Sequence, residues 1–330
     1  KIGSLKDLGS QRGKTDSPQK HYRPPTDKKN TLDQDRKKGT DNKYHKKANI
    51  GWLFSKYYFK GIEGDKSRLE EIKNNPEREK EKVQIEKKLS DHFDRKNENI
   101  IDKDLSNYKA ELDLLKLPDQ VRNLLHFELT TIYPGLFTGS GIPHETHSKG
   151  EFTLGFFFDH TTGLPVIPGS SVKGVLRSAF DHPEYIRFLL KEISQNEYSE
   201  DEIKELERQI FEGEKDSGEK NEKGDPKYIP IPFKDRDIFF DAVIVSPGDK
   251  KEEFLGSDFI TPHKNDEFKD PVPLQFLKVL PGVTFRFQFI LHNSLDGRVT
   301  AENKSVLFKR ILQDIGIGAK TNVGYGKFEK

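Results

Sequence analysis

The residues of this chain best suited to bind a ligand lie in a glycine-rich stretch near its C-terminal end. Two Gly-x-Gly pairs enclose a polar run, and the four glycines are Gly316, Gly318, Gly324 and Gly326. The enclosed run contains Lys320, Thr321 and Asn322. Glycine adopts positive φ angles readily and lets the backbone approach a ligand, so amide groups in such a loop can face an anion. The stretch therefore predicts a phosphate cradle.

This stretch differs from the P-loop of mononucleotide-binding proteins. A P-loop has glycine directly before Lys-Ser/Thr, follows a strand and precedes a helix. Here Ala319 precedes Lys320, and the hydrophobic pattern predicts a helix before the loop, over residues 299–315, and a short strand after it. The pattern therefore disfavours a mononucleotide P-loop.

A second stretch, residues 168–180, combines a helix start with two cations. Apolar residues recur there at helical spacing, and they are Val172, Val175, Leu176 and Ala179. Ser170 or Ser171 can cap this helix. Lys173 and Arg177 lie four residues apart and share a different face of the helix. There they either contact phosphates or pair with carboxylates of the fold.

Together the two stretches resemble the RAMP superfamily, the CRISPR-associated RNA-binding proteins, and within it the subunits of the type III-B (Cmr) effector complex. The resemblance rests on Ile-Pro-Gly-Ser-Ser-x-Lys-Gly-x-x-Arg at 167–177 and on Gly-Ile-Gly-Ala-Lys-Thr-Asn-Val-Gly-Tyr-Gly at 316–326, and it covers about residues 121–330. It implies RNA contacts by the residues at the motif positions. These are Gly169, Ser170, Ser171, Lys173, Arg177, Gly316, Gly318, Lys320, Thr321, Asn322, Gly324, Tyr325 and Gly326.

The resemblance also implies a fold and a set of partners. Strands that alternate with helices suit an α+β fold, and the resemblance implies two ferredoxin-like (RRM-like) βαββαβ units within residues 121–330. The implied partners are crRNA, target RNA, and the other RAMP and small helical subunits of a Cmr complex. No cofactor and no metal are expected.

Two classes of function remain open. In the first, the chain is a non-catalytic subunit that grips the crRNA backbone near its 3′ side and caps the filament of backbone subunits. In the second, it is an endoribonuclease that cuts RNA by general acid/base chemistry without a metal. The glycine loop and the basic helix fit both classes, and the first is favoured because no acid/base pair is apparent in the motifs.

Three histidines and one aspartate are candidates for catalytic or metal-binding groups. His144 and His147 are three residues apart in a glycine-rich segment, unlike the zinc-protease helix, so we expect a loop that contacts RNA or a neighbouring subunit. His263 has no nucleophile or second acid beside it. Asp159 occupies a place comparable to that of the aspartate with which the family's backbone subunit cuts target RNA, but a structural use is favoured.

The composition indicates an uneven charge distribution. The net charge is +1, yet residues 1–60 contain 16 Lys and Arg, six Asp and no Glu. Residues 1–48 therefore suggest a basic, disordered arm that binds nucleic acid or an acidic partner, or is simply solvated. The chain has no cysteine, no secretory leader and no run long enough to span a membrane, so a cytoplasmic location is expected.

Residues 49–120 are expected to form a helical region. Within it, the aromatic cluster at 50–59 is expected to pack onto the body as a strand or turn. The alternative is that the cluster stacks on RNA. The body is expected to begin near residue 121. Its predicted elements are strands at 125–133, 151–158 and 238–245, helices at 168–180, 183–211 and 299–315, a surface loop at 212–227, and an antiparallel hairpin near 274–291.

Overall fold

The computed structural model describes residues 48–103, 124–220, 222–248, 253–261 and 273–329, which belong to one compact unit that extends from Tyr44 to Lys330. The predicted basic arm lies outside the described residues except for its last position. His263 and the end of the predicted helical region, residues 104–120, also lie outside them. The division of the chain into arm, helical region and body therefore stays a prediction.

Helices occupy the described residues that precede the main sheet. They are α2 (Ile50–Ser55), the 3₁₀ turn η1 (Tyr57–Phe59), α3 (Glu63–Ile72), the 3₁₀ turn η2 (Pro76–Arg78) and α4 (Glu79–Ile101). The Tyr58 hydroxyl donates to Asn97 Oδ1 in α4 and accepts from the Phe152 amide in the body, both at 2.7 Å. The packing of the aromatic cluster onto the body is thus confirmed, although the cluster is helical rather than a strand.

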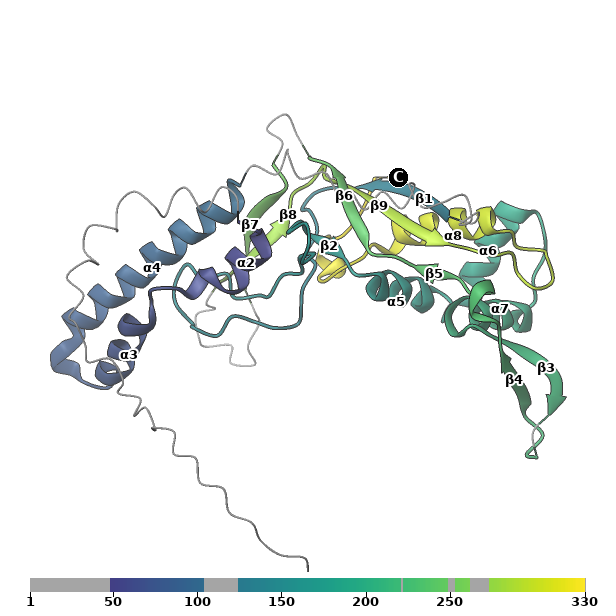
Figure 1. Ribbon diagram of the computed structural model, residues 1–330, viewed down its shortest axis with the longest axis horizontal. Coiled ribbons are helices and arrows are strands. Elements are labelled where there is room, and N and C mark those ends of the chain that lie inside the picture. Colours follow the sequence, from purple (N-terminus) through teal and green to yellow (C-terminus); the bar gives the residue numbers. More distant parts are fainter. Residues whose placement is uncertain (1–47, 104–123, 221, 249–252, 262–272, 330) are drawn as a thin grey trace, which may run out of the picture. The chain divides into compact units, whose positions relative to one another are not determined.

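The main sheet is antiparallel and mixes strands from distant parts of the chain (Figure 1). Its strands are β1 (Leu124–Thr130), β2 (Val166–Ile167), β5 (Ile238–Phe239), β6 (Ala242–Ser246) and β9 (Thr284–Ile290). The order is β1-β9-β6-β2, β5 also pairs with β9, and a bridge between Thr131 and Phe328 adds the C-terminal segment beside β1. The strand predicted at 238–245 is therefore two short strands, β5 and β6, along the same edge of β9.

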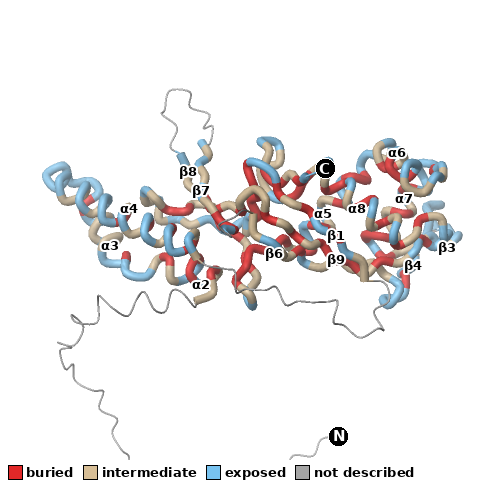
Figure 2. The backbone as a smooth tube through the Cα atoms, turned by 90° about the horizontal axis from the view of Figure 1, so that it is seen from above, coloured by how far each residue is buried: buried red, intermediate tan, exposed pale blue. Residues whose placement is uncertain are grey.

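Helices cover one face of this sheet. They are α5 (Gly169–Ala179), α6 (Pro183–Ser194), α7 (Glu200–Glu207), the π-helical turn η4 (Arg208–Glu212) and α8 (Ala301–Ile315). The Thr300 side chain caps α8 by accepting from the Asn303 amide. Alternating residues of β1 and β9, such as Phe127 and Phe287, are buried against these helices, and Figure 2 shows the buried positions concentrated between the two layers. None of the helices in the described part has the length and apolar character that a bilayer span requires.

A second, two-stranded sheet consists of β7 (Leu255–Ile260) and β8 (Leu274–Val279). The predicted hairpin near 274–291 is wrong, because β8 pairs with β7 while β9 pairs with β1 and β6. The chain turns between β8 and β9 at Gly282, whose φ is +85° and whose amide donates to the Thr131 carbonyl. This contact directs the two strands into different sheets.

Two further predictions also fail. Residues 151–158 form single bridges instead of a strand, because their amides donate to separate segments: Thr153 to Gln275 and Phe157 to Thr138. The predicted loop at 212–227 is a hairpin, β3 (Glu214–Lys220) with β4 (Pro226–Pro230), which projects from the rest of the fold (Figure 1). The cross-strand pair between Lys227 and Glu219 and the stacking of Arg208 on Tyr228 stabilise it.

Candidate nucleic-acid interface

The glycine loop begins directly at the end of α8 and is closed by its own backbone. The Ile317 amide donates to the Gly326 carbonyl at 2.9 Å, and the Gly326 amide donates to the Gly135 carbonyl at 2.8 Å. Gly326 has a φ of +70°, and a Cβ atom there would lie 1.8 Å from the Ile317 carbonyl oxygen, so only glycine fits. The Gly316 and Gly324 amides also donate within the protein. These three glycine amides are therefore not available to an anion, contrary to the predicted cradle.

The open part of the loop is its central polar run. Lys320 is left-handed, with φ 63° and ψ 33°, and leads into the 3₁₀ turn η6 (Thr321–Val323). Within the described residues, no acceptor binds the amides of Gly318, Lys320, Thr321 or Asn322, and no carboxylate pairs with the Lys320 ammonium. Successive amides in such a turn form a concavity that suits an anion. The groups that could face an anion thus lie between Gly318 and Asn322, while the amides of the other three glycines are used within the protein.

Tyr325 anchors the loop instead of presenting its ring to solvent. Its side chain is buried, and its hydroxyl donates to Asp258 Oδ2 at 2.7 Å. Lys278 Nζ lies 2.6 Å from the same oxygen. Burial would raise the pKa of Asp258, but the hydrogen bonds from Lys278 and Tyr325 hold it below its ordinary value. The carboxylate therefore stays ionised and holds the glycine loop against β7 and β8.

The start of α5 requires glycine for a different reason. The Gly169 amide donates to Asp241 Oδ1 at 2.7 Å, and a Cβ atom at this position would lie 2.5 Å from the Phe239 carbonyl oxygen. The predicted cap by Ser170 or Ser171 is wrong, because α5 begins at Gly169, before both serines, and its N-cap residue is Pro168. Both serine side chains are exposed in the first turn of α5.

The two cations of α5 differ in their surroundings. Arg177 pairs with Glu212 at 2.6 Å and with Glu207 at 3.3 Å, which is the carboxylate-pairing alternative left open by the sequence. Lys173 Nζ lies 5.8 Å from the centre of the Phe239 ring, and no ion pair joins it to any described carboxylate. Of the two, Lys173 is thus the cation that can still be neutralised by a phosphate.

One short segment connects the glycine loop with the start of α5. The Phe137 carbonyl accepts from the Ala319 amide of the loop at 2.9 Å. The next residue, Thr138, donates through its hydroxyl to the Val166 carbonyl, at 3.2 Å, in the strand that precedes α5. The structure thus brings both predicted stretches to one region of the fold, although no contact joins Lys320 to Lys173 directly.

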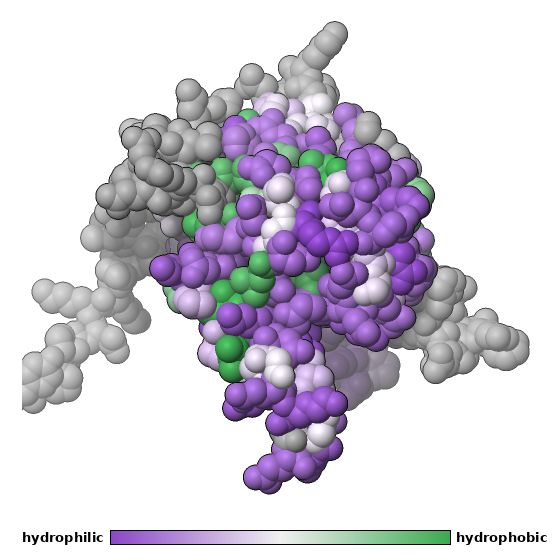
Figure 3. All heavy atoms as spheres, turned by 90° about the vertical axis from the view of Figure 1, so that its right-hand side faces the viewer, coloured by the Kyte–Doolittle hydropathy of each residue, from purple (hydrophilic) through white to green (hydrophobic). Residues whose placement is uncertain are grey.

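The part of the fold around α7 and the β3–β4 hairpin does not suit RNA (Figure 1). A cavity of about 530 Å³ lies there, and carboxylates of α7, β3 and the β9–α8 connection line it. They are Asp201, Glu202, Glu205, Asp216 and Asp296. Figure 3 shows a mainly hydrophilic surface around α7 and the β3–β4 hairpin. Such a carboxylate-lined cavity repels a polyphosphate backbone.

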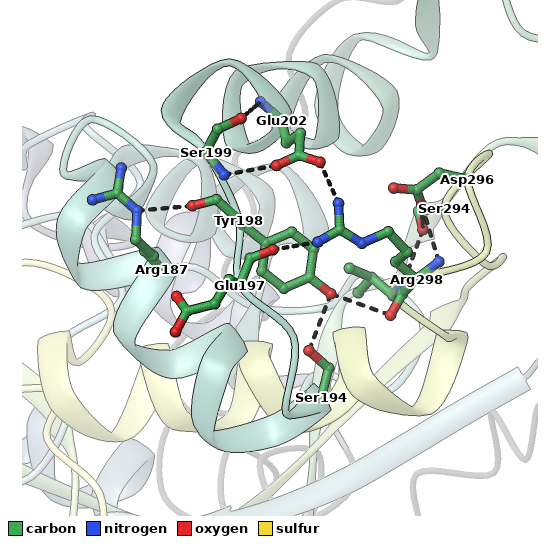
Figure 4. Close-up of polar contacts among 10 residues, drawn as sticks. Arg187, Ser194, Glu197, Tyr198, Ser199, Glu202, Ser294, Asp296 and Arg298 are labelled. Atoms are coloured by element: carbon green, nitrogen blue, oxygen red, sulfur yellow. Dashed lines mark hydrogen bonds and ion pairs between the residues drawn. The ribbon is translucent and has the colours of Figure 1, made fainter.

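The arginine nearest to this cavity is neutralised by the protein itself. The Arg298 guanidinium binds the Glu202 carboxylate and the Glu197 carbonyl, and its Cζ atom lies 4.5 Å from the centre of the Tyr198 ring (Figure 4). This contact ties the α6–α7 connection to the start of α8. Arg298 is therefore a structural cation.

Two of the candidate catalytic residues, His144 and Asp159, have structural partners. The His144 ring packs against Phe54, Phe59 and Tyr58, with centroid distances of 4.5, 4.8 and 5.1 Å, and burial lowers the pKa of His144 to about 4. The His144 ring is thus part of the packing, and the expected contact of the loop that contains His144 and His147 with RNA or a neighbouring subunit stays a prediction. His147 is exposed. No group of three possible metal ligands occurs among the described residues.

Asp159 has a structural role, which is the alternative favoured by the sequence. Its Oδ1 atom accepts from the amides of Thr161 and Thr162 and from the Thr162 hydroxyl, at 2.6–3.0 Å. These bonds organise the turn that follows residue 159. Asp241 and Asp258, which hold the two motifs in place, were missed, because no local pattern distinguishes them from other strand carboxylates.

Comparison with known proteins places the same residues in a recognised family. The model described as the RAMP superfamily matches residues 128–329. Over 254 residues the chain is 28% identical to the CRISPR system CMR subunit Cmr6 of Saccharolobus solfataricus, covering 75% of this chain and 70% of that protein. Over 103 residues it is 32% identical to Cmr6 of Pyrococcus furiosus, covering 27% of this chain and 29% of that protein. A cryo-EM structure of the Type III-B Cmr-beta bound to cognate target RNA aligns with a TM-score of 0.48 and 22% identity, covering 76% of this chain and 72% of that one.

Proposed function

We propose, from the premise that this chain belongs to the RAMP superfamily, that it is an RNA-binding subunit of a type III-B (Cmr) effector complex. The resemblance indicated by the two motifs is confirmed by the family match over residues 128–329. Similarity to Cmr6 of Saccharolobus solfataricus supports membership of a Cmr complex. In this role the chain grips the crRNA backbone near its 3′ side, caps the filament of backbone subunits and contacts the other RAMP and small helical subunits.

The topology of the main sheet supports a ferredoxin-like unit. Along the chain, β1, α5, β6, β9 and α8 follow one another and end at the bridge of Phe328 with Thr131. This sequence is strand, helix, strand, strand, helix, strand, with the last segment beside the first. We infer one such unit here, and the second predicted unit stays a proposal.

The observation that carries the RNA-binding proposal is the open turn at Lys320. It combines an ammonium that no described carboxylate neutralises with successive amides that no described acceptor uses. Contacts of this kind bind phosphates and do not read bases. Binding is therefore expected to be almost independent of RNA sequence.

Replacing Lys320 with alanine should weaken RNA binding and flatten its salt dependence. A cation that neutralises one phosphate of a single strand releases about 0.7 counterion, so the slope of log affinity against log salt should fall by about 0.7. Lys173→Ala should act similarly, and Arg177→Ala less, because Glu207 and Glu212 already neutralise Arg177. Fluorescence anisotropy over a salt series measures the slope.

The matched control is Lys204→Ala, since Lys204 pairs with Glu200 on α7, away from the loop. It should leave the slope unchanged. A wild-type slope for Lys320→Ala, with the fold intact by circular dichroism, would refute the assignment of this turn to phosphate binding.

We expect no ribonuclease activity from the chain. His144 is packed among aromatic rings and the Asp159 carboxylate organises its own turn, so neither group is available as an acid or base. Incubation with a labelled crRNA-like RNA, with and without Mg²⁺, tests this expectation. Cleavage that is lost in His263→Ala and kept in Lys173→Ala would instead support the endoribonuclease function.

A further inference from the structure

A highly exposed aromatic side chain projects beside the glycine loop. Tyr133 is 83% exposed, the highest value among the large hydrophobic side chains of the described residues. Its neighbour Pro134 is buried. An exposed aromatic ring next to a candidate RNA site is in a position to stack on a base.

The backbone around Tyr133 is held on both sides. The Gly135 amide donates to the Ile132 carbonyl at 2.8 Å, which closes the turn, and the Ile132 amide donates to the Lys327 carbonyl at 3.1 Å. The Gly326 amide donates to the Gly135 carbonyl at 2.8 Å. The turn is thus bonded to the segment that ends the glycine loop. A ring on such a backbone loses little conformational freedom when a ligand stacks on it.

The same contacts place Tyr133 next to the open part of the loop. A Cβ atom at Gly324 would lie 3.3 Å from Pro134 Cδ, so the proline ring lies against the residue that follows Val323. Val323 is itself 69% exposed. The Tyr325 amide donates to the Lys320 carbonyl, which connects this part of the loop to the open turn. Aromatic, apolar and cationic groups therefore lie close together at one surface.

We propose that the Tyr133 ring is the stacking platform for one base of a single-stranded RNA whose phosphate is bound at the Lys320 turn. This inference rests on the proposed RNA-binding function and adds a base contact to it. Every base has a π-face, so stacking increases affinity without selecting a sequence. A protein partner fits less well, because the exposed apolar residues here are few and border a cation and open amides.

The test compares Tyr133→Ala and Tyr133→Phe in the full chain. Binding of a single-stranded RNA oligonucleotide and of its abasic counterpart is measured by fluorescence anisotropy at low salt and over a salt series. Tyr133→Ala should weaken binding of the normal RNA about five-fold or more. The slope against log salt should stay unchanged because no charge is lost. Tyr133→Phe should bind nearly as well as the wild type, and the abasic RNA should not distinguish the variants.

The matched control is Phe233→Ala. Phe233 is 77% exposed, in the 3₁₀ turn η5 (Phe233–Asp235), and its removal should leave RNA affinity unchanged. Wild-type affinity of Tyr133→Ala together with weakened binding by Lys320→Ala would refute the stacking inference alone. If neither variant changes binding, the proposed function of the site fails as well. Loss of assembly with partner subunits at unchanged RNA affinity would identify Tyr133 as a protein contact and overturn the inference.

Discussion

Replacing Asp237 with alanine should lower the free energy of unfolding by about 3–5 kcal/mol, because it leaves a buried ammonium without its counter-charge. The Asp237 and Lys304 side chains are only 2% and 3% exposed, and Lys304 Nζ lies 2.6 Å from Asp237 Oδ2. The other carboxylate oxygen accepts from the His292 amide at 2.8 Å. Urea denaturation followed by circular dichroism measures the change.

The pH dependence of this variant supplies a second readout. Burial lowers the pKa of Lys304, against the opposing effect of Asp237, and without Asp237 it should fall further. The unfolded chain then holds a proton that the folded chain does not, up to the ordinary pKa of lysine. Between the lowered pKa of Lys304 in the folded variant and the ordinary pKa of lysine, the free energy of unfolding of Asp237→Ala should therefore rise with pH more steeply than that of the wild type.

Two controls separate the buried pair from a general effect on α8. Arg310 lies on α8, and its exposed ion-pair partner is Glu192. Glu192→Ala removes this partner and should leave the free energy of unfolding nearly unchanged. The double variant Asp237→Leu with Lys304→Met should recover most of the lost stability, since neither buried charge remains. A single variant as stable as the wild type would contradict the prediction. The pair holds α8, which leads directly into the glycine loop.

The stability of the protein should also fall by up to about 3 kcal/mol between pH 6.5 and pH 4 through His144 alone. Burial lowers the pKa of His144 from 6.5 to about 4, and it outweighs the opposing effect of the Phe152 backbone. As the pH falls through this window, the unfolded chain takes up a proton that the folded chain cannot accommodate. The expected direction is therefore destabilisation by acid.

His144→Leu should remove this contribution, so its unfolding free energy should depend less on pH than that of the wild type between pH 6.5 and pH 4. The matched control is His147→Asn, three residues away, where the side chain is exposed and φ is +54°. Asparagine tolerates this conformation, and the pH profile should match the wild type. Parallel profiles for His144→Leu and the wild type would show that His144 is not the acid-sensitive group.

Local patterns in the sequence were sufficient for the helices α5 and α8 and for the position of the loop. Helical spacing of apolar residues predicts α5 and α8, and both lie within two residues of the expected bounds. The alternation of apolar and polar residues that predicts β1 is likewise a pattern within one short segment of the chain. The two glycine-containing motifs indicated the RAMP family, which the match over residues 128–329 confirms.

Only the tertiary structure decided which groups bind one another. Alternation shows which side of a strand is buried, but it does not identify the partner strand, so β8 and β9 were paired with each other although they belong to different sheets. Likewise, spacing left open whether Arg177 contacts phosphate or pairs with carboxylates. The structure decides for pairing, because Glu207 and Glu212, which lie 30 and 35 positions later, reach it. The availability of the loop amides depends on Gly135 and Phe137, almost two hundred residues before them. Such contacts depend on distances in space between distant segments, and local periodicity contains no information about them.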